Sequence, residues 1–344
     1  MTGEVRFTYA DAGVDIRAAE NLTNRFSALA ASTRAAEVSG EFGSFGARFR
    51  LEGDPELVAS ADGVGTKVLV ARMAGRHGTV GEDLVNHCVN DILTEGAEPL
   101  FFMDYFACGR LDTDVAFEVV SGIARGCREN GCALLGGETA EMPGMYSPED
   151  YDLAGFIVGR VSFDVPGRES LMVGDQLVAL PSSGLHTNGY SLARSILFER
   201  MGLGVGDEFP GTGDSVADVL LRVHISYLRT LAPACRAGEI RALAHITGGG
   251  IPGNLSRALP SDRDAVVRIG SWDPGPVFGL LASESGLGRD DLYETLNMGV
   301  GMIAIVRPES VNEVLDSVAA EGTLGFVCGE IRDGSGVVRL EGPA

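Results

Sequence analysis

Residues 82–107 read EDLVNHCVNDILTEGAEPLFFMDYFA, and the fold class can be predicted from this segment outward. Its first half places the apolar residues Leu84, Val85, Cys88, Val89, Ile92 and Leu93 on one helical face, which predicts an amphipathic helix over residues 82–95. Gly96 is a typical residue to end such a helix, and residues 100–107 then read as a buried strand. A helix followed directly by a buried strand is typical of α/β folds.

Strand-like and helix-like runs alternate on both sides of this stretch. Residues 57–60 and 66–70 are predicted strands, Asp112 is predicted to cap a helix that ends before Gly131, and residues 132–135 and 156–161 are predicted strands. The alternation restarts near residue 173, with strands expected at 177–180, 240–246, 302–306 and 325–332 and helices at 190–200, 216–234 and 311–320. We therefore expect two α/β domains, residues 1–165 and 166–344, divided near Pro166-Gly167.

Composition and charge exclude several classes of protein. Of the 344 residues, 45% are apolar and 22% are charged, which is typical of a globular chain. The net charge of −21 would repel a nucleic acid or an anionic membrane surface, and no cluster of Lys and Arg counters it. We therefore expect no nucleic-acid or membrane partner. An anionic ligand remains possible, because backbone N–H groups and metal ions bind phosphate locally.

Cysteine usage and the N-terminus predict a soluble, cytoplasmic protein. The six Cys form no CxxC pair, which favours buried free thiols in a reducing compartment. Residues 1–9 lack the apolar core of a signal peptide, and no apolar run reaches the ~18 residues that span a bilayer.

The segment Asp62-Gly63-Val64-Gly65-Thr66-Lys67 is the first candidate for chemistry. Its two glycines allow the backbone to approach a ligand, and its Asp could hold a divalent cation against phosphate oxygens. The segment is not a Walker A loop, because GxxxxGK[ST] is absent. The alternative is a tight turn without a function.

Two further acidic segments could complete a metal site. His87, Asn90 and Asp91 share the polar face of the predicted helix, although a solvated face is the simpler interpretation and His87 is interpreted as a hydrogen-bonded side chain rather than a catalyst. Residues 136–144 read GGETAEMPG after a buried strand, which places Glu138 at a strand end or in an ordinary polar loop. Three carboxylates are a coherent set for Mg²⁺ and phosphate.

Three glycine-containing segments remain. Two of them, residues 182–189 (SSGLHTNG) and 247–254 (TGGGIPGN), could bind a phosphate or a polar substrate. The alternative is an ordinary capped turn for the first segment and a flexible loop for the second. Because GxSxG is missing, nucleophilic catalysis by a serine is not expected. Residues 299–304 (GVGMIA) match GxGxxA, but a strand follows instead of a helix, so a dinucleotide site is rejected.

Taken together and in this order, the motifs closely resemble the phosphoribosylformylglycinamidine cyclo-ligase family, also called aminoimidazole ribonucleotide synthetases. The resemblance spans about Tyr9 to Leu340, and GGETAEMPGMY is its most specific part. It rests on YADAGVD (9–15), DGVGTK (62–67), VND (89–91), GAEPLFFMDY (96–105), GGETAEMPGMY (136–146), YDLAGFIVG (151–159), SSGLHTNGYS (182–191), HITGGG (245–250) and NMGVGM (297–302).

The resemblance implies a two-domain ATP-binding architecture with mixed sheets, and a homodimer whose N-terminal domains pair into a β-barrel. It implies that ATP phosphorylates the formyl oxygen of formylglycinamidine ribonucleotide, after which an amidine nitrogen closes the imidazole ring and phosphate leaves. Such chemistry depends on positioning and charge neutralisation more than on a side-chain nucleophile.

The family's functional residues carry over by position. Asp62, Asp91 and Glu138 would serve Mg²⁺ and the ATP phosphates and, with His186, be catalytic. The nucleotide-binding residues would be Gly63, Gly65, Thr66, Lys67, Asn90 and Asp11. The substrate-binding residues would be Thr187, Asn188, Gly248, Gly249, Gly250 and Asn297.

The chain departs from the family pattern mainly at basic residues. Ala10 replaces a usual Lys, Ala35-Ala36-Glu37-Val38 replaces Arg-Pro-Glu-Val, Val223-His224-Ile225 replaces Pro-Thr-Arg or Pro-Thr-Lys, and Leu296 replaces Phe. These changes keep two alternatives open. One is a paralogue that activates another amide-like substrate with ATP, and the other is a non-catalytic binding protein with the same fold. Kinases acting on thiamine phosphate or selenide share only the looser glycine patterns.

Overall fold

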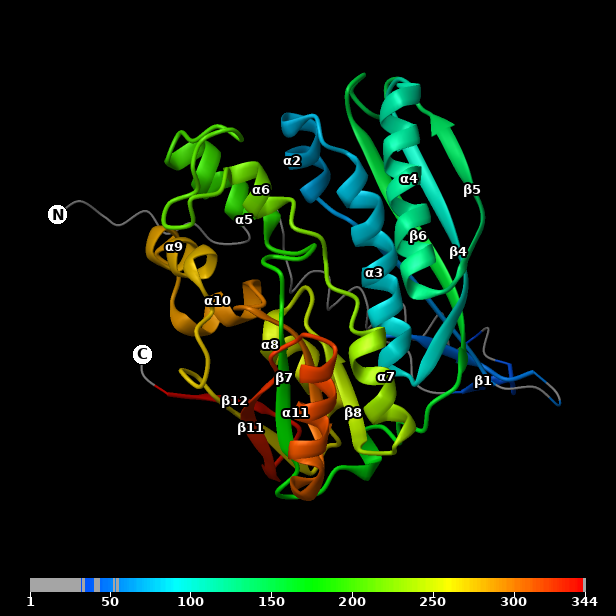
Figure 1. The fold of residues 1–344 in the computed structure, drawn as a ribbon, viewed down its shortest axis with the longest axis vertical. Coiled ribbons are helices and arrows are strands. Elements are labelled where there is room, and N and C mark those ends of the chain that lie inside the picture. Colours follow the sequence, from blue (N-terminus) through cyan, green and yellow to red (C-terminus); the bar gives the residue numbers. More distant parts are fainter. Residues whose placement is uncertain (1–31, 33–34, 40–43, 52, 54–55, 343–344) are drawn as a thin grey trace.

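The computed structural model describes residues 32, 35–39, 44–51, 53 and 56–342. Within them the chain forms two six-stranded mixed sheets, one in each half, with helices packed on them (Figure 1). This is the predicted α/β class. Ala10 and Asp11 lie outside the described residues.

The N-terminal sheet has the strand order β1-β2-β3-β6-β4-β5. Neighbouring strands are antiparallel, except that β4 and β5 are parallel and are joined through helix α4 (Thr113–Asn130). The strands are β1 (Val38–Ser39), β2 (Ala47–Phe49), β3 (Leu57–Gly63), β4 (Ala97–Cys108), β5 (Ala133–Glu141) and β6 (Tyr151–Val161).

Helices α3 (Gly78–Thr94) and α4 cover one face of this sheet. Asp112 caps α4 by accepting hydrogen bonds from the N–H groups of Asp114 and Val115, and Gly131 ends it in the left-handed conformation, as predicted. The two helices touch at glycines, since a Cβ added to Gly122 would lie 1.9 Å from the carbonyl oxygen of Gly78. This close approach fixes the position of α3.

The C-terminal sheet has the order β12-β9-β11-β7-β10-β8 and is antiparallel apart from the β12–β9 pair. Its strands are β7 (Gln176–Pro181), β8 (Ile240–His245), β9 (Arg263–Arg268), β10 (Val300–Val306), β11 (Phe326–Asp333) and β12 (Val338–Glu341). The helices of this half are α5 (Tyr190–Arg194), α6 (Val216–Leu220), α7 (Leu228–Arg236), α8 (Gly250–Leu255), α9 (Pro276–Ser285), α10 (Arg289–Thr295) and α11 (Val311–Ala320). Single turns are formed by η1 (Arg168–Ser170), the π-helical η2 (Ser195–Arg200), η3 (Ser256–Ala258) and η4 (Pro308–Ser310).

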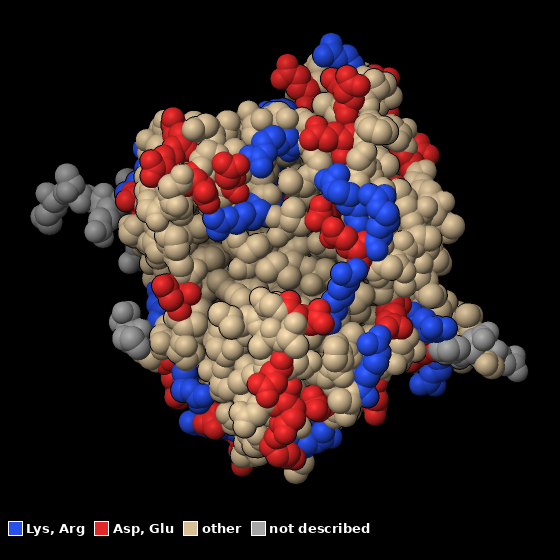
Figure 2. Space-filling model, viewed as in Figure 1, with Lys and Arg blue, Asp and Glu red and all other residues tan. Residues whose placement is uncertain are grey.

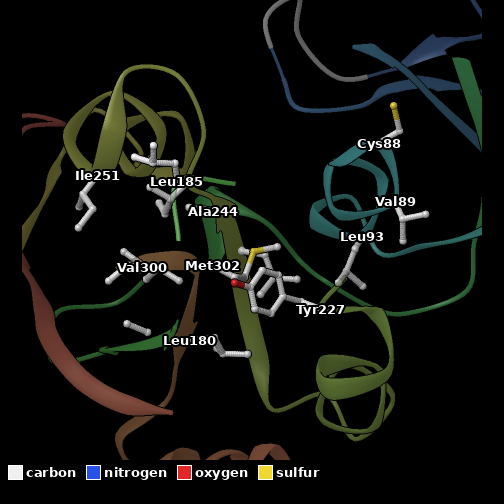
Figure 3. Packing of buried hydrophobic residues seen from close by; sticks show 14 of the residues in the cluster. Cys88, Val89, Leu93, Leu180, Leu185, Tyr227, Ala244, Ile251, Val300 and Met302 are labelled. Atoms are coloured by element: carbon white, nitrogen blue, oxygen red, sulfur yellow. The ribbon is translucent and has the colours of Figure 1, made fainter. Parts of the chain in front are cut away.

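Helix α3 lies between the two halves and contacts both the N-terminal sheet and β8 (Figure 1). Every residue of α3 from Asp83 to Thr94 is buried. Its apolar side chains, including Cys88, Val89 and Leu93, belong to the same core as Tyr227 and Met302 of the C-terminal half (Figure 3). The polar face of this helix is therefore covered by the second half, and the solvated-face interpretation is wrong.

Three predicted elements differ from the structure. The strand expected over 132–135 continues to Glu141 as β5, so Glu138 lies within a strand and not at its end or in a loop. Residues 66–70 were expected to be a strand, but they begin helix α2 (Lys67–Ala74), whose buried residues Lys67, Val68, Val70 and Ala71 recur at helical spacing. The helix expected over 216–234 is interrupted between α6 and α7. Polar side chains of α3 bind the backbone of this interruption, so tertiary contacts override the local preference.

Among the described residues, none of the helices combines the length and the apolar character that crossing a bilayer requires.

Candidate active site

A cavity of about 400 Å³ lies where the ends of several elements meet. It gathers residues from the β3–α2 turn, from α3, from the segment after β7 and from the glycine segment after β8. Its lining residues are Asp62, Gly63, Gly65, His87, Thr187, Asn188, Thr247 and Gly248. Six of these eight residues were predicted from the sequence as site residues. The fold brings all eight together from four separate segments of the chain.

The backbone favours glycine at Gly65 in the cavity wall and at Gly249, which follows the lining residue Gly248. Gly65 has φ +64° and Gly249 has φ +90°, and both angles lie in the left-handed region that favours glycine. Gly248 packs closely as well, because an added Cβ would lie 3.1 Å from Asn188 Oδ1. Residues of the glycine segments therefore form part of the wall of the cavity.

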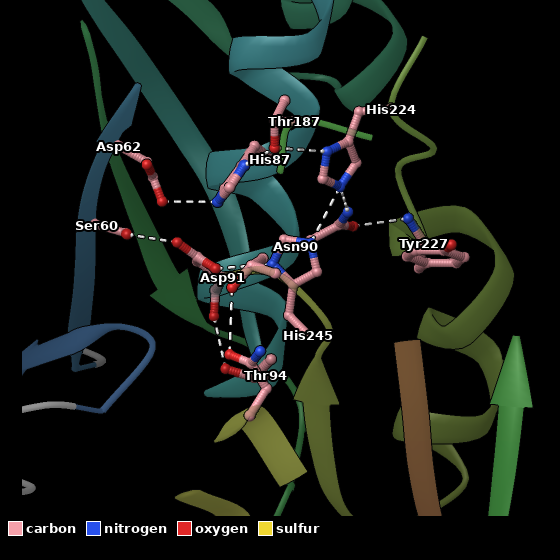
Figure 4. A network of polar contacts seen from close by, with 12 residues as sticks. Ser60, Asp62, His87, Asn90, Asp91, Thr94, Thr187, His224, Tyr227 and His245 are labelled. Carbon is pink, nitrogen blue, oxygen red and sulfur yellow. Dashed lines mark hydrogen bonds and ion pairs between the residues drawn. The ribbon is translucent and has the colours of Figure 1, made fainter. Parts of the chain in front are cut away.

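Asp62 and His87 form an ion pair at the cavity wall, with 2.6 Å between Oδ2 and Nε2 (Figure 4). Burial would raise the pKa of Asp62, but the charge and hydrogen bond of His87 lower it overall. Burial would lower the pKa of His87, but Asp62, Asp91 and Asp83 raise it to about 9. Asp62 is thus held ionised, facing the cavity.

Asp91 lies deeper, beside the same imidazole ring (Figure 4). Its Oδ1 is 2.8 Å from His245 Nδ1, and its Oδ2 accepts a hydrogen bond of 3.0 Å from the Ser60 hydroxyl. Because His245 stands at the end of β8, this contact joins the two halves of the chain. Asp62 pairs with His87, and ligand atoms of Asp91 lie within 4.8 Å of those of His87 and His245.

The segment between α6 and α7 is fastened to α3 by three side chains. His224 N–H donates to Asp83 Oδ1, Asn86 Nδ2 donates to the His224 carbonyl, and Asn90 Nδ2 donates to the Ile225 carbonyl, each over 2.7 Å. Asn90 is fully buried and also accepts from the Tyr227 N–H group. Its contacts are with this segment, so it does not line the cavity as a nucleotide-binding residue would.

His186 was predicted to be catalytic, but its ring lies behind the cavity. Its Nε2 accepts a hydrogen bond of 3.1 Å from the Ser183 N–H, and its ring stacks on His224 with 3.9 Å between centroids. The residue is 1% exposed and burial lowers its pKa well below the ordinary value. These contacts suit a residue that shapes the loop holding Thr187 and Asn188.

Lys67 also lies away from the cavity. Its Nζ is 2.7 Å from Asp83 Oδ2 and donates to the carbonyl of Arg222, and both charged side chains are completely buried. This geometry supports a structural ion pair between α2 and α3 rather than a phosphate contact. Thr66 lies beside it, with its hydroxyl 3.2 Å from the Ser191 hydroxyl.

Glu138 is not brought to the two aspartates within one chain. It lies on the edge strand β5, opposite Tyr105, and strands β4 and β6 separate it from β3. Asn297 is also placed elsewhere: it is buried and donates to the Gly184 carbonyl while accepting from the Gly299 N–H. Gly250 begins α8 against the carbonyl of Tyr293.

Sequence reasoning missed the imidazole partners of the aspartates. His87 was interpreted as a hydrogen-bonded side chain, which its contacts with Asp62 and Thr187 confirm, but these partners were not predicted. His224 was interpreted as a lost basic residue, and His245 as part of a motif without its own role. The basic Arg257, which follows the glycine segment, was also missed; its guanidinium stacks 3.7 Å from the ring centroid of Phe45. Nothing in a single sequence shows that residues this far apart converge.

Comparisons with known proteins agree with this architecture. The family profile "AIR synthase related protein, N-terminal domain" matches residues 43–161, and "AIR synthase related protein, C-terminal domain" matches residues 172–341. Solved structures of similar fold include a thiamine-monophosphate kinase from Stenotrophomonas maltophilia (TM-score 0.62, 17% identity, covering 91% of this chain and 94% of that one). Another is Escherichia coli HypE, a hydrogenase maturation protein (TM-score 0.60, 19% identity, covering 86% and 87%). At these identities the likeness shows the fold alone.

Curated relatives are much more similar in sequence. A phosphoribosylformylglycinamidine cyclo-ligase from Geobacter sulfurreducens is 47% identical over 94% of this chain and 95% of its own length. One from Myxococcus xanthus is 48% identical over 96% and 97%. The chain belongs to the phosphoribosylformylglycinamidine cyclo-ligase family.

Proposed function

We propose that this chain is an ATP-dependent ligase that converts formylglycinamidine ribonucleotide into 5-aminoimidazole ribonucleotide, ADP and phosphate in purine biosynthesis. The observation that carries the proposal is its identity of 47–48% with curated cyclo-ligases over about 95% of the chain. The cavity supports it, because all of its lining residues except His87 belong to the family motifs. We propose that the enzyme works in the cytoplasm.

Ring closure requires a good leaving group on the formyl carbon, and its oxygen leaves poorly until it is phosphorylated. The formyl oxygen attacks the γ-phosphorus of ATP, and ADP leaves. An amidine nitrogen then attacks the activated carbon and loses its proton, and the C–O bond breaks as phosphate departs. These steps require that reactants be held in line and that developing negative charge be neutralised.

The cavity residues match these requirements by position and polarity. Gly63, Gly65 and Gly248 let the backbone approach phosphate oxygens closely. Thr187 and Asn188 offer a hydroxyl and an amide to a polar substrate. Among the described residues, none that lines the cavity is Lys or Arg, and a cation entering with the nucleotide would neutralise its charge.

Asp62 and Asp91 fit such a cation. Both carboxylates lie beside the same ring of His87, and Asp62 faces the cavity (Figure 4). We propose that they hold the Mg²⁺ that enters with ATP, which would neutralise phosphate charge. Charged side chains of both signs are interspersed in small groups over the face shown in Figure 2. This distribution favours small ligands over nucleic acid as partners.

We also propose a homodimer formed through the N-terminal sheet. The face opposite α3 and α4 exposes five large apolar side chains, each 38% to 63% exposed: Leu100, Met103, Tyr105, Leu135 and Phe156. Several large apolar side chains exposed on one sheet are typical of a protein interface. Pairing two sheets there would form the family's barrel and place Glu138 of the edge strand at the interface. The two domains of each chain would then be residues 1–165 and 166–344.

The test is to incubate the purified protein with formylglycinamidine ribonucleotide, ATP and Mg²⁺ and to measure aminoimidazole ribonucleotide and ADP together. We expect equal amounts of both, and loss of both in Asp62→Asn. ATP binding without product, while a curated relative turns over in parallel, would contradict the proposal and favour a paralogue or a binding protein.

A further inference from the structure

Three histidines that are far apart in the sequence form a buried histidine cluster beside the cavity. His87 comes from α3, and His224 and His245 come from the C-terminal half. Their ring centroids are 5.0 to 5.2 Å apart, and each of the three residues is at most 3% exposed. Burying an imidazole is costly unless its nitrogens find partners, so these partners indicate what the cluster does.

The ring of His87 contacts a cavity residue with each of its two nitrogens. Its Nε2 is 2.6 Å from Asp62 Oδ2, and its Nδ1 is 2.7 Å from Thr187 Oγ1 (Figure 4). Asp62 belongs to β3 of the N-terminal half, and Thr187 follows β7 in the C-terminal half. One imidazole therefore bridges the two halves of the chain at the wall of the cavity.

The neighbouring rings restrict the orientation of this imidazole. The His224 ring is tilted by 48° against the His87 ring, and the His245 ring meets it edge-on, at 77°. His245 is itself held, because its Nδ1 is 2.8 Å from Asp91 Oδ1. The His87 side chain is 4% exposed, whereas the Asp62 side chain is 41% exposed. The ring is thus fixed behind a carboxylate that stays open to the cavity.

The two ends of this bridge serve different ligands of the proposed reaction. Asp62 would serve the Mg²⁺ that enters with ATP, and Thr187 would offer its hydroxyl to the ribonucleotide substrate. Phosphoryl transfer depends on holding the two reactants in line, and a misplacement of about 1 Å can lower the rate about 100-fold. A residue that fixes both ends at once therefore affects the reaction without touching either reactant.

We propose that His87 is a positioning residue for this reaction, which holds the nucleotide-side carboxylate of Asp62 and the substrate-side hydroxyl of Thr187 in one fixed relation. Both of its ring nitrogens are already engaged, so His87 itself binds neither the cation nor the substrate. The inference rests on the proposed function, since it names a further residue for that same site.

Two substitutions at His87 separate the two contacts. The side-chain amide of Gln reaches the position of the ring Nε2, whereas the shorter amide of Asn reaches that of Nδ1. His87→Gln therefore keeps a donor for Asp62 and loses the contact with Thr187. His87→Asn keeps the contact with Thr187 and loses the one with Asp62. A merely structural role of His87 would not separate the two variants in this way.

The test uses calorimetry on the full-length protein. One titration gives the Kd for the β,γ-imido analogue of ATP with Mg²⁺, and a second gives the Kd for formylglycinamidine ribonucleotide. His87→Asn is expected to raise the Kd for the ATP analogue about 10-fold and to change the Kd for the ribonucleotide less than about twofold. His87→Gln is expected to raise the Kd for the ribonucleotide about 5-fold and to change that for the ATP analogue less than about twofold.

Turnover supplies a second readout and the control. Both His87 variants should lower kcat at saturating ligands by at least about 10-fold, because the two reactants are no longer held in one relation. The matched control is His77→Gln, because His77 lies outside the histidine cluster, against Tyr151, and this variant should keep both Kd values and kcat.

The same effect of His87→Gln and His87→Asn on both ligands, or equal changes in His77→Gln, would overturn the proposal. Wild-type protein labelled with ¹⁵N-histidine gives a measurement that needs no variant. The ring signals of His87 should shift with either ligand, and if no imidazole signal responds to both, the proposal is overturned even when a variant fails to fold.

The two proposals fail in different ways. Product formation by the wild type, with unchanged Kd values in both His87 variants, defeats this inference alone. Absence of product in the wild type, with the expected Kd changes in the two variants, defeats the proposed function alone.

Discussion

At the scale of single residues, burial decides which polar side chains can meet a ligand. Asp62, Thr187 and Asn188 line the cavity, whereas Lys67 and His186 of the same two motifs are buried in the protein. The two groups cannot be told apart by residue type. Lys67 is the sharpest case, because a lysine after a glycine turn suggests phosphate binding and is instead paired with Asp83.

We predict that Lys67→Met lowers the free energy of unfolding by about 3–5 kcal/mol, because Asp83 is left as a buried, unpaired charge. Denaturant unfolding measures the loss. Adding Asp83→Asn should recover much of it, since Asn keeps the oxygen that accepts from the His224 N–H. A raised KM for ATP with unchanged stability would instead assign Lys67 to the nucleotide.

The cysteine thiols differ in burial and should therefore differ in reactivity. Burial raises the pKa of Cys235 and Cys328 to about 12, whereas a hydrogen bond from Cys127 lowers the pKa of the partly exposed Cys132. Because the thiolate is the reactive form, one thiol should react quickly with an alkylating reagent at neutral pH. Mass spectrometry should find it at Cys132, and Cys132→Ser should remove the fast phase. Rapid labelling of Cys235 or Cys328 would be inconsistent with this burial.

At the scale of elements, α3 organises the site. It carries His87 and Asp91 toward the cavity, binds the α6–α7 segment through Asp83, Asn86 and Asn90, and packs against α4 through glycines. A displacement of α3 should therefore disturb binding residues that the substitution itself does not touch.

We predict that Gly122→Ala lowers both stability and turnover, because its Cβ would lie 1.9 Å from the Gly78 carbonyl and would push α4 from α3. The expected loss of stability is about 1–3 kcal/mol, the range for overpacking. The matched control is Gly279→Ala in α9, whose Cβ meets nothing within 4 Å. Melting temperature and product formation are measured for both variants. Equal values in the two variants would show that the close α3–α4 contact does not limit stability or turnover.

At the level of the whole molecule, the two halves meet along α3. The described part of the chain leaves apolar side chains of the N-terminal sheet exposed. The proposed dimer covers them. A charged side chain placed at the centre of such an interface should prevent dimerisation, whereas a charge placed outside the interface should not.

We predict that the wild type has twice the chain mass of 36.0 kDa in solution and that Phe156→Glu has the single-chain mass. Phe117→Glu is the control, because Phe117 is 76% exposed on α4, away from the sheet face. Light scattering after size exclusion gives the masses. A monomeric wild type, or a dimeric Phe156→Glu that remains folded by circular dichroism, would contradict the proposed interface.

Much of this molecule could be predicted from its sequence, and the exceptions have a common cause. Periodicity located α4 together with its Asp112 cap, and the glycine motifs located most of the cavity wall. Two secondary-structure predictions were wrong: the strand over 66–70 and the single helix over 216–234. Contacts with α3 and neighbouring elements override the local preference of both segments. The histidine cluster could not be predicted, because its members are separated in sequence and only the packing of α3 against β8 brings them together.

The proposed reaction is tested most directly by tracing the formyl oxygen from the substrate into the products. The substrate would be labelled with ¹⁸O at the formyl group and converted by the wild-type protein with ATP, and the inorganic phosphate would be analysed by mass spectrometry. If the formyl oxygen attacks ATP in this cavity, each phosphate released should carry one ¹⁸O atom, in step with aminoimidazole ribonucleotide. Phosphate without the label, or no ring-closed product, would contradict the proposed reaction.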